Sequence, residues 1–469
     1  MSDTSTIDST VRSAESAFED YRRASRGDRA NFLRRIADEI ERRGESITRI
    51  ANRETALPEA RLEGERSRTT GQLRLFASHI EDGAYLDYRH DAAIPDRAPL
   101  PRPDLRVWQI PVGPVAVFGA SNFPLAFSVA GGDTASALAA GCTVVAKGHP
   151  AHPGTCEIVA EAIEAAAADC EMPAGTFSLL RGTSNAVGEA LVTHPLIQAV
   201  GFTGSLAGGR ALFDLCAGRP QPIPFFGELG SVNPVFILPG AIDSRADALG
   251  QGWATSLTMG VGQFCTNPGV VIAPCGESTE WFIRAASARL ASVGEQTMLT
   301  EGIAAGFRAG VTRIESASAA RKRIGAASDG RDASPYLFSV SGERWLDQPA
   351  LHDEVFGPLG IVVEAADETE MLEIAANLDG QLTCTIHYDS TDEDTVRRLL
   401  PILERKAGRL VGNGFPTGVE VCDAMMHGGP YPASTNVGAT SVGTLAIRRF
   451  LRPVCYQDLS ANLAAPNPE

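Results

Sequence analysis

The sequence predicts an α/β protein built on parallel sheets, and three features of the chain support this fold class. Short apolar runs alternate with helical stretches between residues 115 and 217, which is typical of βαβ units and therefore of a parallel sheet. A second series of strands and helices begins at Glu228. A length of 469 residues, with 44% hydrophobic and 21% charged residues, suits two or three domains with substantial cores.

The first hundred residues predict helices and then an entering hairpin. Helical spacing of apolar residues indicates a helix over residues 28–55, with Asp28 as its cap and Gly44 as a stop signal, and a polar helix over 59–80. The segment from Arg106 alternates and then becomes uniformly apolar, so we expect a hairpin followed by a buried strand.

Two series of strands follow. In the first, from about residue 115, the expected strands are 143–146, 177–180 and 197–202, followed by helices at 154–168, 185–193 and 205–216. In the second, the expected elements are a strand at 235–238, a helix at 244–258 and strands near residues 270, 361 and 383. The tail after Leu445 predicts a strand whose exposed edge seeks a partner subunit.

Charge and composition exclude several classes of function. The chain has 41 basic against 57 acidic residues, a net charge of -16, so no surface for nucleic acid or anionic lipid is expected. Nine cysteines without a C-x-x-C pair fit neither a disulfide framework nor a zinc ribbon. Neither a signal peptide nor a run of about 18 apolar residues is present, so we expect a cytoplasmic protein without membrane partners.

Cys265 is the first candidate for chemistry. It lies in M-G-V-G-Q-F-C-T-N-P-G, where glycines supply a loop that approaches a ligand closely. An isolated cysteine is more often an inert core residue, but polar Gln263, Thr266 and Asn267 surround this one. A polar, accessible setting is what a reactive thiolate needs.

Two more polar residues follow apolar strands. Glu228, in F-F-G-E-L-G, lies where α/β sheets place functional groups, although a turn acid is the simpler interpretation. Asn122, in F-G-A-S-N-F-P, is placed to donate its amide to an oxyanion, although asparagine before Phe-Pro also forms turns.

Other segments suggest a nucleotide site. G-F-T-G-S, which ends at Gly204 and Ser205, joins a strand to a helix, so its amides are placed to receive phosphate, but it is not a G-x-G-x-x-G motif. Lys147, one of only three lysines, ends a strand, and Glu354 in H-D-E-V-F-G-P-L could bind a sugar hydroxyl pair. The histidines of H-P-A-H lack a third ligand, so no metal site is expected.

Taken in order, the motifs S-N-F-P, V-V-A-K, G-F-T-G-S, G-E-L-G, G-Q-F-C and E-V-F-G-P-L resemble those of the aldehyde dehydrogenase superfamily, over roughly residues 20 to 460. Within it, the segments G-A-S-N-F-P-L-A-F-S-V-A-G-G, H-P-A-H-P and H-G-G-P-Y-P-A-S-T look like those of the 2-oxoglutarate semialdehyde (2,5-dioxopentanoate) dehydrogenases. A related group oxidises fatty aldehydes, so a fatty aldehyde or another semialdehyde stays an alternative substrate.

The resemblance implies a role for each matching residue. It implies Cys265 as nucleophile, Glu228 as general base and Asn122 as oxyanion donor. It implies that the cofactor residues are Lys147, Gly204, Ser205 and Glu354. For the substrate we expect contacts with Phe123, Gln263 and Arg74, with Arg74 as partner of a substrate carboxylate. Glu228 should work best with a pKa raised toward neutrality by partial burial.

Two departures from the family pattern bear on these roles. Gly269 stands where many members have an arginine four residues after the nucleophile, and Pro150 where many have an acid three after the lysine. Without that acid, a 2′-phosphate is not repelled and Lys147 or Arg181 could pair with it, so NADP is favoured over NAD.

The implied architecture has a Rossmann-type nucleotide-binding domain, an α/β catalytic domain and a small oligomerisation sheet. We place them at 1–90 with 107–227, at 228–424, and at 91–106 with 445–469, and expect a homodimer or homotetramer. Two other classes of function stay open: a cofactor-free cysteine acyl transferase or thioesterase, and a non-catalytic member, which would be expected to have lost one of Asn122, Glu228 and Cys265.

Overall fold

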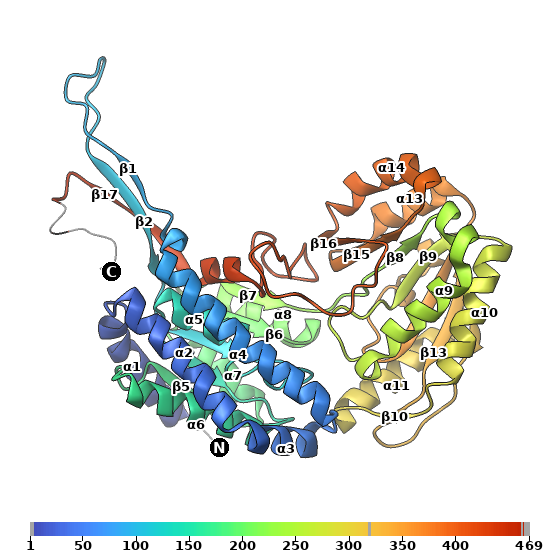
Figure 1. Ribbon diagram of the computed structural model, residues 1–469, viewed down its shortest axis with the longest axis horizontal. Helices are drawn as coiled ribbons and strands as arrows, with labels where there is room; N and C mark the ends of the chain where they lie inside the picture. Colours follow the sequence, from blue (N-terminus) through green and yellow to red (C-terminus); the bar gives the residue numbers. More distant parts are fainter. Residues whose placement is uncertain (1–3, 318–319, 461–462, 464–469) are drawn as a thin grey trace.

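The computed structural model describes residues 4–317, 320–460 and 463. Two lobes lie side by side, one built from the first half of the chain and one mainly from the second, and a narrow arm projects from the first lobe (Figure 1). Within the described residues, no helix is both long and apolar enough to cross a membrane.

The first lobe is built on a five-stranded parallel sheet in the order β5-β4-β3-β6-β7. Its strands are β3 (Val115–Phe118), β4 (Val144–Lys147), β5 (Phe177–Leu180), β6 (Ala199–Thr203) and β7 (Phe225–Glu228). The chain runs outward from β3 to β5 and then returns to the other side of β3. This reversal opens a crevice beyond the carboxyl ends of β3 and β6, the usual ligand site of such sheets.

Helices cover both faces of this sheet because successive residues of each strand point to opposite sides. Val115 and Val117 pack into a core shared with α2, α4, α5 and α6, whereas Ala116 and Phe118 pack into a core shared with α1 and α7. The helices of this lobe are α1 (Thr4–Tyr21), α2 (Arg26–Arg42), α3 (Gly44–Thr55), α4 (Glu59–Asp82), α5 (Gly132–Ala140), α6 (Pro153–Asp169), α7 (Asn185–Thr193) and α8 (Leu206–Ala217).

The predicted helix over residues 28–55 is wrong in its continuity, since two helices, α2 and α3, occupy this region. Ser25, not Asp28, caps α2: its side chain accepts a hydrogen bond from the Asp28 backbone N–H. Gly44 begins α3 rather than ending a helix. A Cβ at Gly44 would lie 2.9 Å from Cζ of Arg66, whose Nη1 donates to the Gly44 carbonyl at 3.1 Å, so glycine here leaves room for that guanidinium.

The second lobe is built on a seven-stranded sheet in the order β11-β13-β14-β9-β8-β15-β16, parallel except for the pairing of β11 with β13. The strands are β8 (Val235–Ile237), β9 (Val270–Pro274), β11 (Arg321–Ile324), β13 (Tyr336–Ser341), β14 (Leu359–Ala365), β15 (Gln381–His387) and β16 (Ala407–Gly412). The strands expected near residues 270, 361 and 383 are confirmed.

Helices also cover both faces of this second sheet. Residues of α9 and α10 form the core on one face, and residues of α11, α13 and α14 form the core on the other. The helices are α9 (Pro239–Thr258), α10 (Glu277–Ala291), α11 (Glu301–Ser316), α12 (Gly342–Asp347), α13 (Glu368–Asn377) and α14 (Glu393–Leu403). A short antiparallel pair, β10 (Gln296–Thr297) and β12 (Asp332–Ala333), lies beside them.

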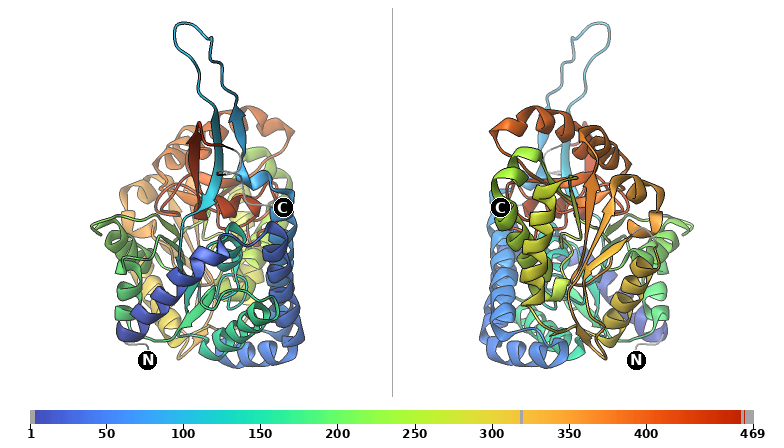
Figure 2. Two further views of the ribbon diagram at one scale, coloured as in Figure 1. Left: turned by 90° about the vertical axis from the view of Figure 1, so that its left-hand side faces the viewer. Right: turned by 90° about the vertical axis from the view of Figure 1, so that its right-hand side faces the viewer.

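The arm is a three-stranded antiparallel sheet of β1 (Arg89–Asp91), β2 (Leu105–Pro111) and β17 (Leu451–Gln457), with β2 in the centre. Perpendicular views show the chain between β1 and β2 projecting beyond both lobes (Figure 2). The strand expected in the tail is confirmed as β17. The domain boundaries stay predictions, and residues 1–3, 318–319, 461–462 and 464–469 of the predicted domains lie outside the described residues.

Candidate active site

Strand ends from both lobes meet around one cavity of about 370 Å³, which lies at the crevice beyond β3, β6 and β7. Its lining includes residues of the loops after these strands and of the loop that precedes β9. Among the predicted site residues, it brings together Asn122, Gly204, Ser205, Glu228, Cys265 and Glu354.

Cys265 lies in a loop, as its flanking glycines predict, and an unusual turn precedes it. Gly260, Val261 and Gly262 have φ angles of 56°, 61° and 66°, so three successive residues of the turn η2 (Met259–Gly262) are left-handed. For the β-branched Val261 this conformation is strained, a feature that clusters at functional sites. A Cβ at Gly262 would lie 2.3 Å from the Gly357 carbonyl carbon, so only glycine allows this approach.

Buried side chains fix the loop from the other side. Nδ2 of Asn233 donates to the carbonyl oxygens of Cys265 at 2.8 Å and Asn267 at 3.0 Å. Nε1 of Trp253 donates to the carbonyl of Pro268 at 2.9 Å. The Cys265 thiol is therefore presented by a loop whose backbone is held on both sides of it.

A histidine joins the thiol to the carboxylate. Nε2 of His427 lies 2.9 Å from Oε1 of Glu228 and 3.3 Å from Sγ of Cys265. The Ser441 hydroxyl donates to Oε2 of Glu228 at 2.6 Å. His427, Glu228 and Ser441 are all buried. Glu228 is thus bonded through both oxygens inside the fold, which excludes the interpretation that it is a turn acid.

The sequence interpretation missed His427. It belongs to H-G-G-P-Y-P-A-S-T, which entered only as part of a family resemblance. The structure folds this segment back over β7: the Leu229 N–H donates to the carbonyl of Ala433, and Glu228 forms a β-bridge with Ser434. The available signal was a histidine followed by two glycines and a proline. This pattern predicts a loop but does not show which residues the histidine contacts.

The electrostatics of Glu228 differ from the expectation. Burial by itself raises the pKa of this carboxyl, but the charge of His427 and hydrogen bonds from His427, Ser441 and Cys265 outweigh it, so the pKa of Glu228 lies below its ordinary value. The predicted rise toward neutrality is wrong. Burial and the neighbouring Glu228 charge raise the pKa of Cys265 well above its usual range, so the resting group is a neutral thiol.

Asn122 is held at both ends beside this group. Its Nδ2 donates to the Gln263 carbonyl at 2.9 Å, and its own backbone carbonyl accepts from Nη2 of Arg61 at 2.7 Å. The predicted substrate role of the Gln263 side chain is wrong. That side chain is fully buried, and its amide is bonded to the Gly260 carbonyl and the Leu299 N–H.

Of the other two predicted substrate residues, Phe123 lies near Cys265 and Arg74 does not. The Phe123 ring packs edge to face against Phe264, the residue before Cys265, with centroids 5.2 Å apart. Its role in binding substrate stays a prediction. Arg74 does not reach the site: it is exposed on α4 and pairs with Asp38 of α2 at 2.9 Å, so its assignment to a substrate carboxylate is wrong.

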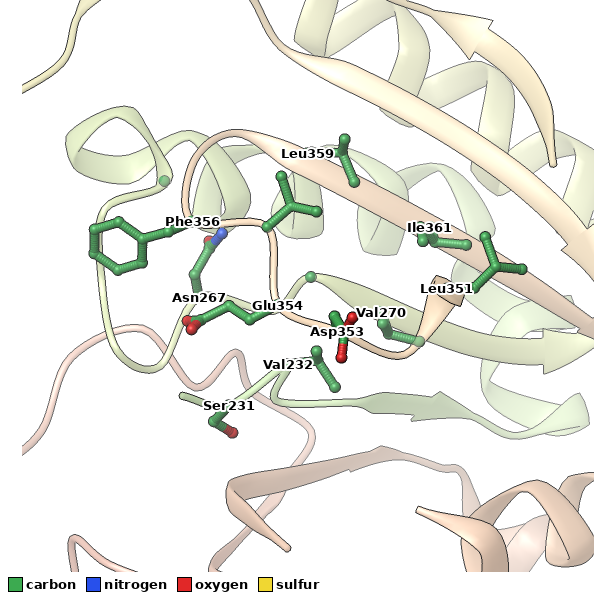
Figure 3. Close-up of a pocket in the computed structure, with 13 residues that line it drawn as sticks. Ser231, Val232, Asn267, Val270, Leu351, Asp353, Glu354, Phe356, Leu359 and Ile361 are labelled. Atoms are coloured by element: carbon green, nitrogen blue, oxygen red, sulfur yellow. The ribbon is translucent and has the colours of Figure 1, made fainter. Parts of the chain in front are cut away.

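Three of the predicted cofactor residues line the cavity: Gly204 and Ser205 from the first lobe and Glu354 from the second. Ser205 caps α8 by accepting from the Gly208 N–H, and Gly204 precedes it. Glu354 lies between Asn267 and Ser231 and also borders a small cavity of about 20 Å³, shown in Figure 3. The protein packed around its carboxyl raises the pKa of Glu354 to about 8. A carboxyl that borders the cavity and has no ion-pair partner in the described part of the chain suits donation from a ribose hydroxyl pair.

Two cations lie farther along the same sheet edge. Lys147 ends β4 and is paired in register with Leu180, the residue before Arg181. Burial lowers the pKa of Lys147, which indicates that its ammonium group is partly desolvated. Arg181 is exposed and pairs with Glu157 at 2.9 Å. These positions fit an anionic group that extends from the cavity along the sheet edge.

The expectation of no metal site overlooked one set of ligand atoms. Among the described residues, Glu228, Cys265 and His427 offer ligand atoms that all lie within 4.8 Å of one another. Carboxylate, thiolate and imidazole are all ligands of Zn²⁺. A metal bound here would be coordinated by Sγ of Cys265, which could then not act as the nucleophile.

Comparison with known proteins agrees with this geometry. The model of the aldehyde dehydrogenase family matches residues 1–440. The chain is 53% identical over 453 residues to alpha-ketoglutaric semialdehyde dehydrogenase 2 of Azospirillum brasilense, covering 96% of this chain and 86% of the relative. It is 48% identical over 461 residues to alpha-ketoglutaric semialdehyde dehydrogenase of Acinetobacter baylyi, covering 97% and 86%.

Solved structures show the same fold at low sequence identity. NADP-dependent glyceraldehyde-3-phosphate dehydrogenase of Bacillus halodurans superposes with a TM-score of 0.81 at 20% identity, covering 97% of this chain and 91% of that one. The match over almost the whole chain, the fold and the two close relatives together establish that this protein belongs to the aldehyde dehydrogenase family.

Proposed function

We propose that this protein oxidises an aldehyde to a carboxylic acid through a thioester on Cys265. The observation that carries this proposal is the contact of the thiol with His427, which in turn contacts Glu228, beside the fixed amide of Asn122. Enzymes of this family oxidise aldehydes to acids with NAD(P). A nucleophile, a proton acceptor and an oxyanion donor in one cavity are the groups that this chemistry requires.

The first step uses the unusual proton affinities of the site. Cys265 is a neutral thiol at rest because its pKa is raised, whereas Glu228 is ionised because its pKa is lowered. As sulfur attacks the aldehyde carbon, the thiol proton passes to the Glu228–His427 pair and a carbon–sulfur bond forms. The Asn122 amide stabilises the oxyanion, a contribution typically of about 3 to 4 kcal/mol.

NAD(P) bound by Gly204, Ser205 and Glu354 would accept the hydride that the thiohemiacetal carbon loses on becoming a thioester. The thioester that results is hydrolysed by water whose proton Glu228 accepts, and the Cys265 thiol is restored when the carbon–sulfur bond breaks. Each turnover therefore consumes one aldehyde, one oxidised cofactor and one water, and yields one carboxylate, one reduced cofactor and two protons, which leave through the Glu228–His427 pair.

For the substrate we propose 2,5-dioxopentanoate, the semialdehyde of 2-oxoglutarate, with 2-oxoglutarate as product. Support comes from the names of the relatives at 53% and 48% identity, both alpha-ketoglutaric semialdehyde dehydrogenases. Fatty aldehydes and other semialdehydes are the competing substrates. Comparison of kcat/KM for 2,5-dioxopentanoate, succinic semialdehyde and decanal distinguishes them.

For the cofactor we propose NADP in preference to NAD. Pro150 stands where an acid would repel a 2′-phosphate, and Lys147 and Arg181 are neighbours at the sheet edge. Loss of either cation should therefore raise KM for NADP more than KM for NAD. Equal effects on the two cofactors in Arg181→Ala and Lys147→Ala would contradict the preference.

We also propose that the protein forms homo-oligomers through the arm. In the part of the chain that the structure describes, β17 pairs with β2 on one side only, which leaves a strand edge available for a second subunit. Sedimentation of the full chain tests this, and a monomer at micromolar concentration would refute it.

The central experiment is substitution of the nucleophile. Cys265→Ala should abolish aldehyde-dependent reduction of NADP while cofactor binding, followed by fluorescence, is retained. Unchanged turnover would remove Cys265 from the mechanism. Hydrolysis of an ester or thioester without any dehydrogenation by the wild type would instead indicate a cofactor-free cysteine acyl transferase or thioesterase.

A further inference from the structure

Arg68, an arginine on α4 beside the thiol, leaves three of its five N–H donors without a hydrogen-bond partner among the described residues. Nη1 of Arg68 donates to the carbonyl of Val419, but its Nε and Nη2 are buried without a hydrogen-bond partner among the described residues. The guanidinium lies over the Phe127 ring, 5.6 Å from its centroid, and Phe127 in turn lies 6.2 Å from the His427 ring. Arg68 therefore flanks the reactive group on the side of Phe127.

The unused atoms form one recognition edge. Nε–H and Nη2–H of an arginine point in parallel from the same edge of the guanidinium and match the two oxygens of a carboxylate. The chain itself shows this use: Arg42 donates from Nε to Oε1 of Glu39 at 3.2 Å and from Nη2 to Oε2 at 2.7 Å. At Arg68 the same edge has no such acceptor, although leaving buried charged donors unpaired is costly.

The surroundings of Arg68 do not neutralise it. The buried acid three residues earlier on α4, Glu65, uses Oε1 to accept from the backbone N–H groups of Leu125 and Ala126, and burial raises its pKa. No ion pair within 4.0 Å joins Glu65 to Arg68 in the described part of the chain. Burial lowers the pKa of Arg68. The charges of four neighbours raise it by less than burial lowers it: Cys265, Glu65, Glu420 and Glu228.

A second cation adds to the positive charge. Arg409 of β16 uses Nη1 and Nη2 on the carbonyls of Gly418 and Pro416, and its charge also acts on Cys265. Arg61 is different, since it holds the Asn122 carbonyl and lies over Phe123 and Phe264. Arg68 is thus the guanidinium with a free recognition edge, and Arg409 reinforces its field.

We infer that the Nε/Nη2 edge of Arg68 binds a carboxylate at the far end of the aldehyde substrate, so that the enzyme selects short aldehydes that carry an acid. This inference rests on the proposed reaction at Cys265. In 2,5-dioxopentanoate four carbon–carbon bonds, spanning about 5 Å, separate the aldehyde carbon from the carboxylate carbon. The charge of Arg68 acts on the Cys265 thiol, so this cation suits a substrate with a carbon chain of that length and not a long fatty aldehyde.

The test compares selectivity in two arginine variants of the same helix. Arg68→Met should lower the ratio of kcat/KM for 2,5-dioxopentanoate to that for pentanal by about 100-fold, mainly through KM for the anionic substrate, since the contact exists before and during reaction. Arg74→Met is the matched control, because Arg74 is exposed and bound to Asp38, and it should keep the wild-type ratio. Arg68→Lys should recover part of the ratio.

A binding measurement separates recognition from chemistry. Glutarate, an unreactive dicarboxylate, should bind wild type and Arg74→Met in calorimetry and should not bind Arg68→Met. An unchanged selectivity ratio, or equal glutarate affinity in the two variants, would overturn the inference even if both proteins fold. Failure of the wild type to oxidise either aldehyde would instead refute the proposed reaction, so the two failures are distinguishable.

Discussion

Replacement of His427 by phenylalanine is the sharpest perturbation that the site offers. The imidazole is the group that contacts both Cys265 and Glu228, at 3.3 and 2.9 Å, and phenylalanine keeps an aromatic ring without the nitrogens. Hydrogen bonds to charged groups contribute about 1.5 to 3 kcal/mol. If this contribution is made in the transition state, kcat/KM should fall by about 10- to 150-fold, since each 1.36 kcal/mol is about tenfold in rate.

The pH dependence separates a positioning role from a structural one. Burial opposes ionisation of Glu228, and the charge of His427 is the largest influence that lowers its pKa. Without His427, burial prevails and the pKa of Glu228 rises, so the acidic limb of the kcat/KM profile should move to higher pH. Ser441→Ala is the control: it removes the 2.6 Å bond to the other oxygen and should move the limb in the same direction by less.

The assay is the initial rate of NADP reduction across the pH range, with unfolding temperatures measured for each variant. The reasoning would be refuted if the acidic limb of the kcat/KM profile lay at the same pH in His427→Phe and wild type, at any level of activity. That result would mean that His427 does not counteract the effect of burial on the pKa of Glu228.

Three other perturbations follow from the same geometry. Asn122→Ala should lower kcat by about 10²- to 10³-fold with little change in cofactor affinity; loss of NADP binding instead, seen by calorimetry, would reassign the residue. Because the pKa of Glu354 rises from 4.5 to about 8 in the fold, wild type loses stability as pH rises across that interval. The unfolding temperature of Glu354→Gln minus that of wild type should therefore be more positive at about pH 8.5 than at about pH 5.5. The same difference at both pH values would contradict the raised pKa of Glu354. Zn²⁺ should inhibit by binding Cys265 and His427, reversibly with EDTA and less in His427→Phe; equal inhibition of both proteins would exclude the cluster as its target.

Local patterns in the sequence predicted much of this molecule. The βαβ alternation located strands and helices, and 177–180 and 185–193 match β5 and α7 in both bounds. The glycines around Cys265 predicted a loop, and the structure shows why: left-handed turns and the contact of Gly262 with Gly357 cannot be made by a packed strand. These properties depend on neighbours along the chain, which sequence patterns report directly.

What the sequence could not determine depends on residues far apart in the chain. His427 lies 199 positions from Glu228 and 162 from Cys265, and only the return of the tail over β7 brings them together. The direction of the Glu228 pKa shift followed from that contact, so burial alone predicted it wrongly.

The two arginines of α4 show the same limit on a smaller scale. Arg68 and Arg74 are six residues apart, which places them about 120° apart around a helix with about 100° per residue. The sequence marked Arg74 as the partner of a carboxylate, but packing of α4 against α2 turns it toward Asp38 and turns Arg68 toward Cys265. The chain by itself determined that a reactive cysteine, an acid and an amide follow strand ends, while tertiary packing decided which further groups surround them, because the rotation of a helix about its axis is fixed only by what it packs against.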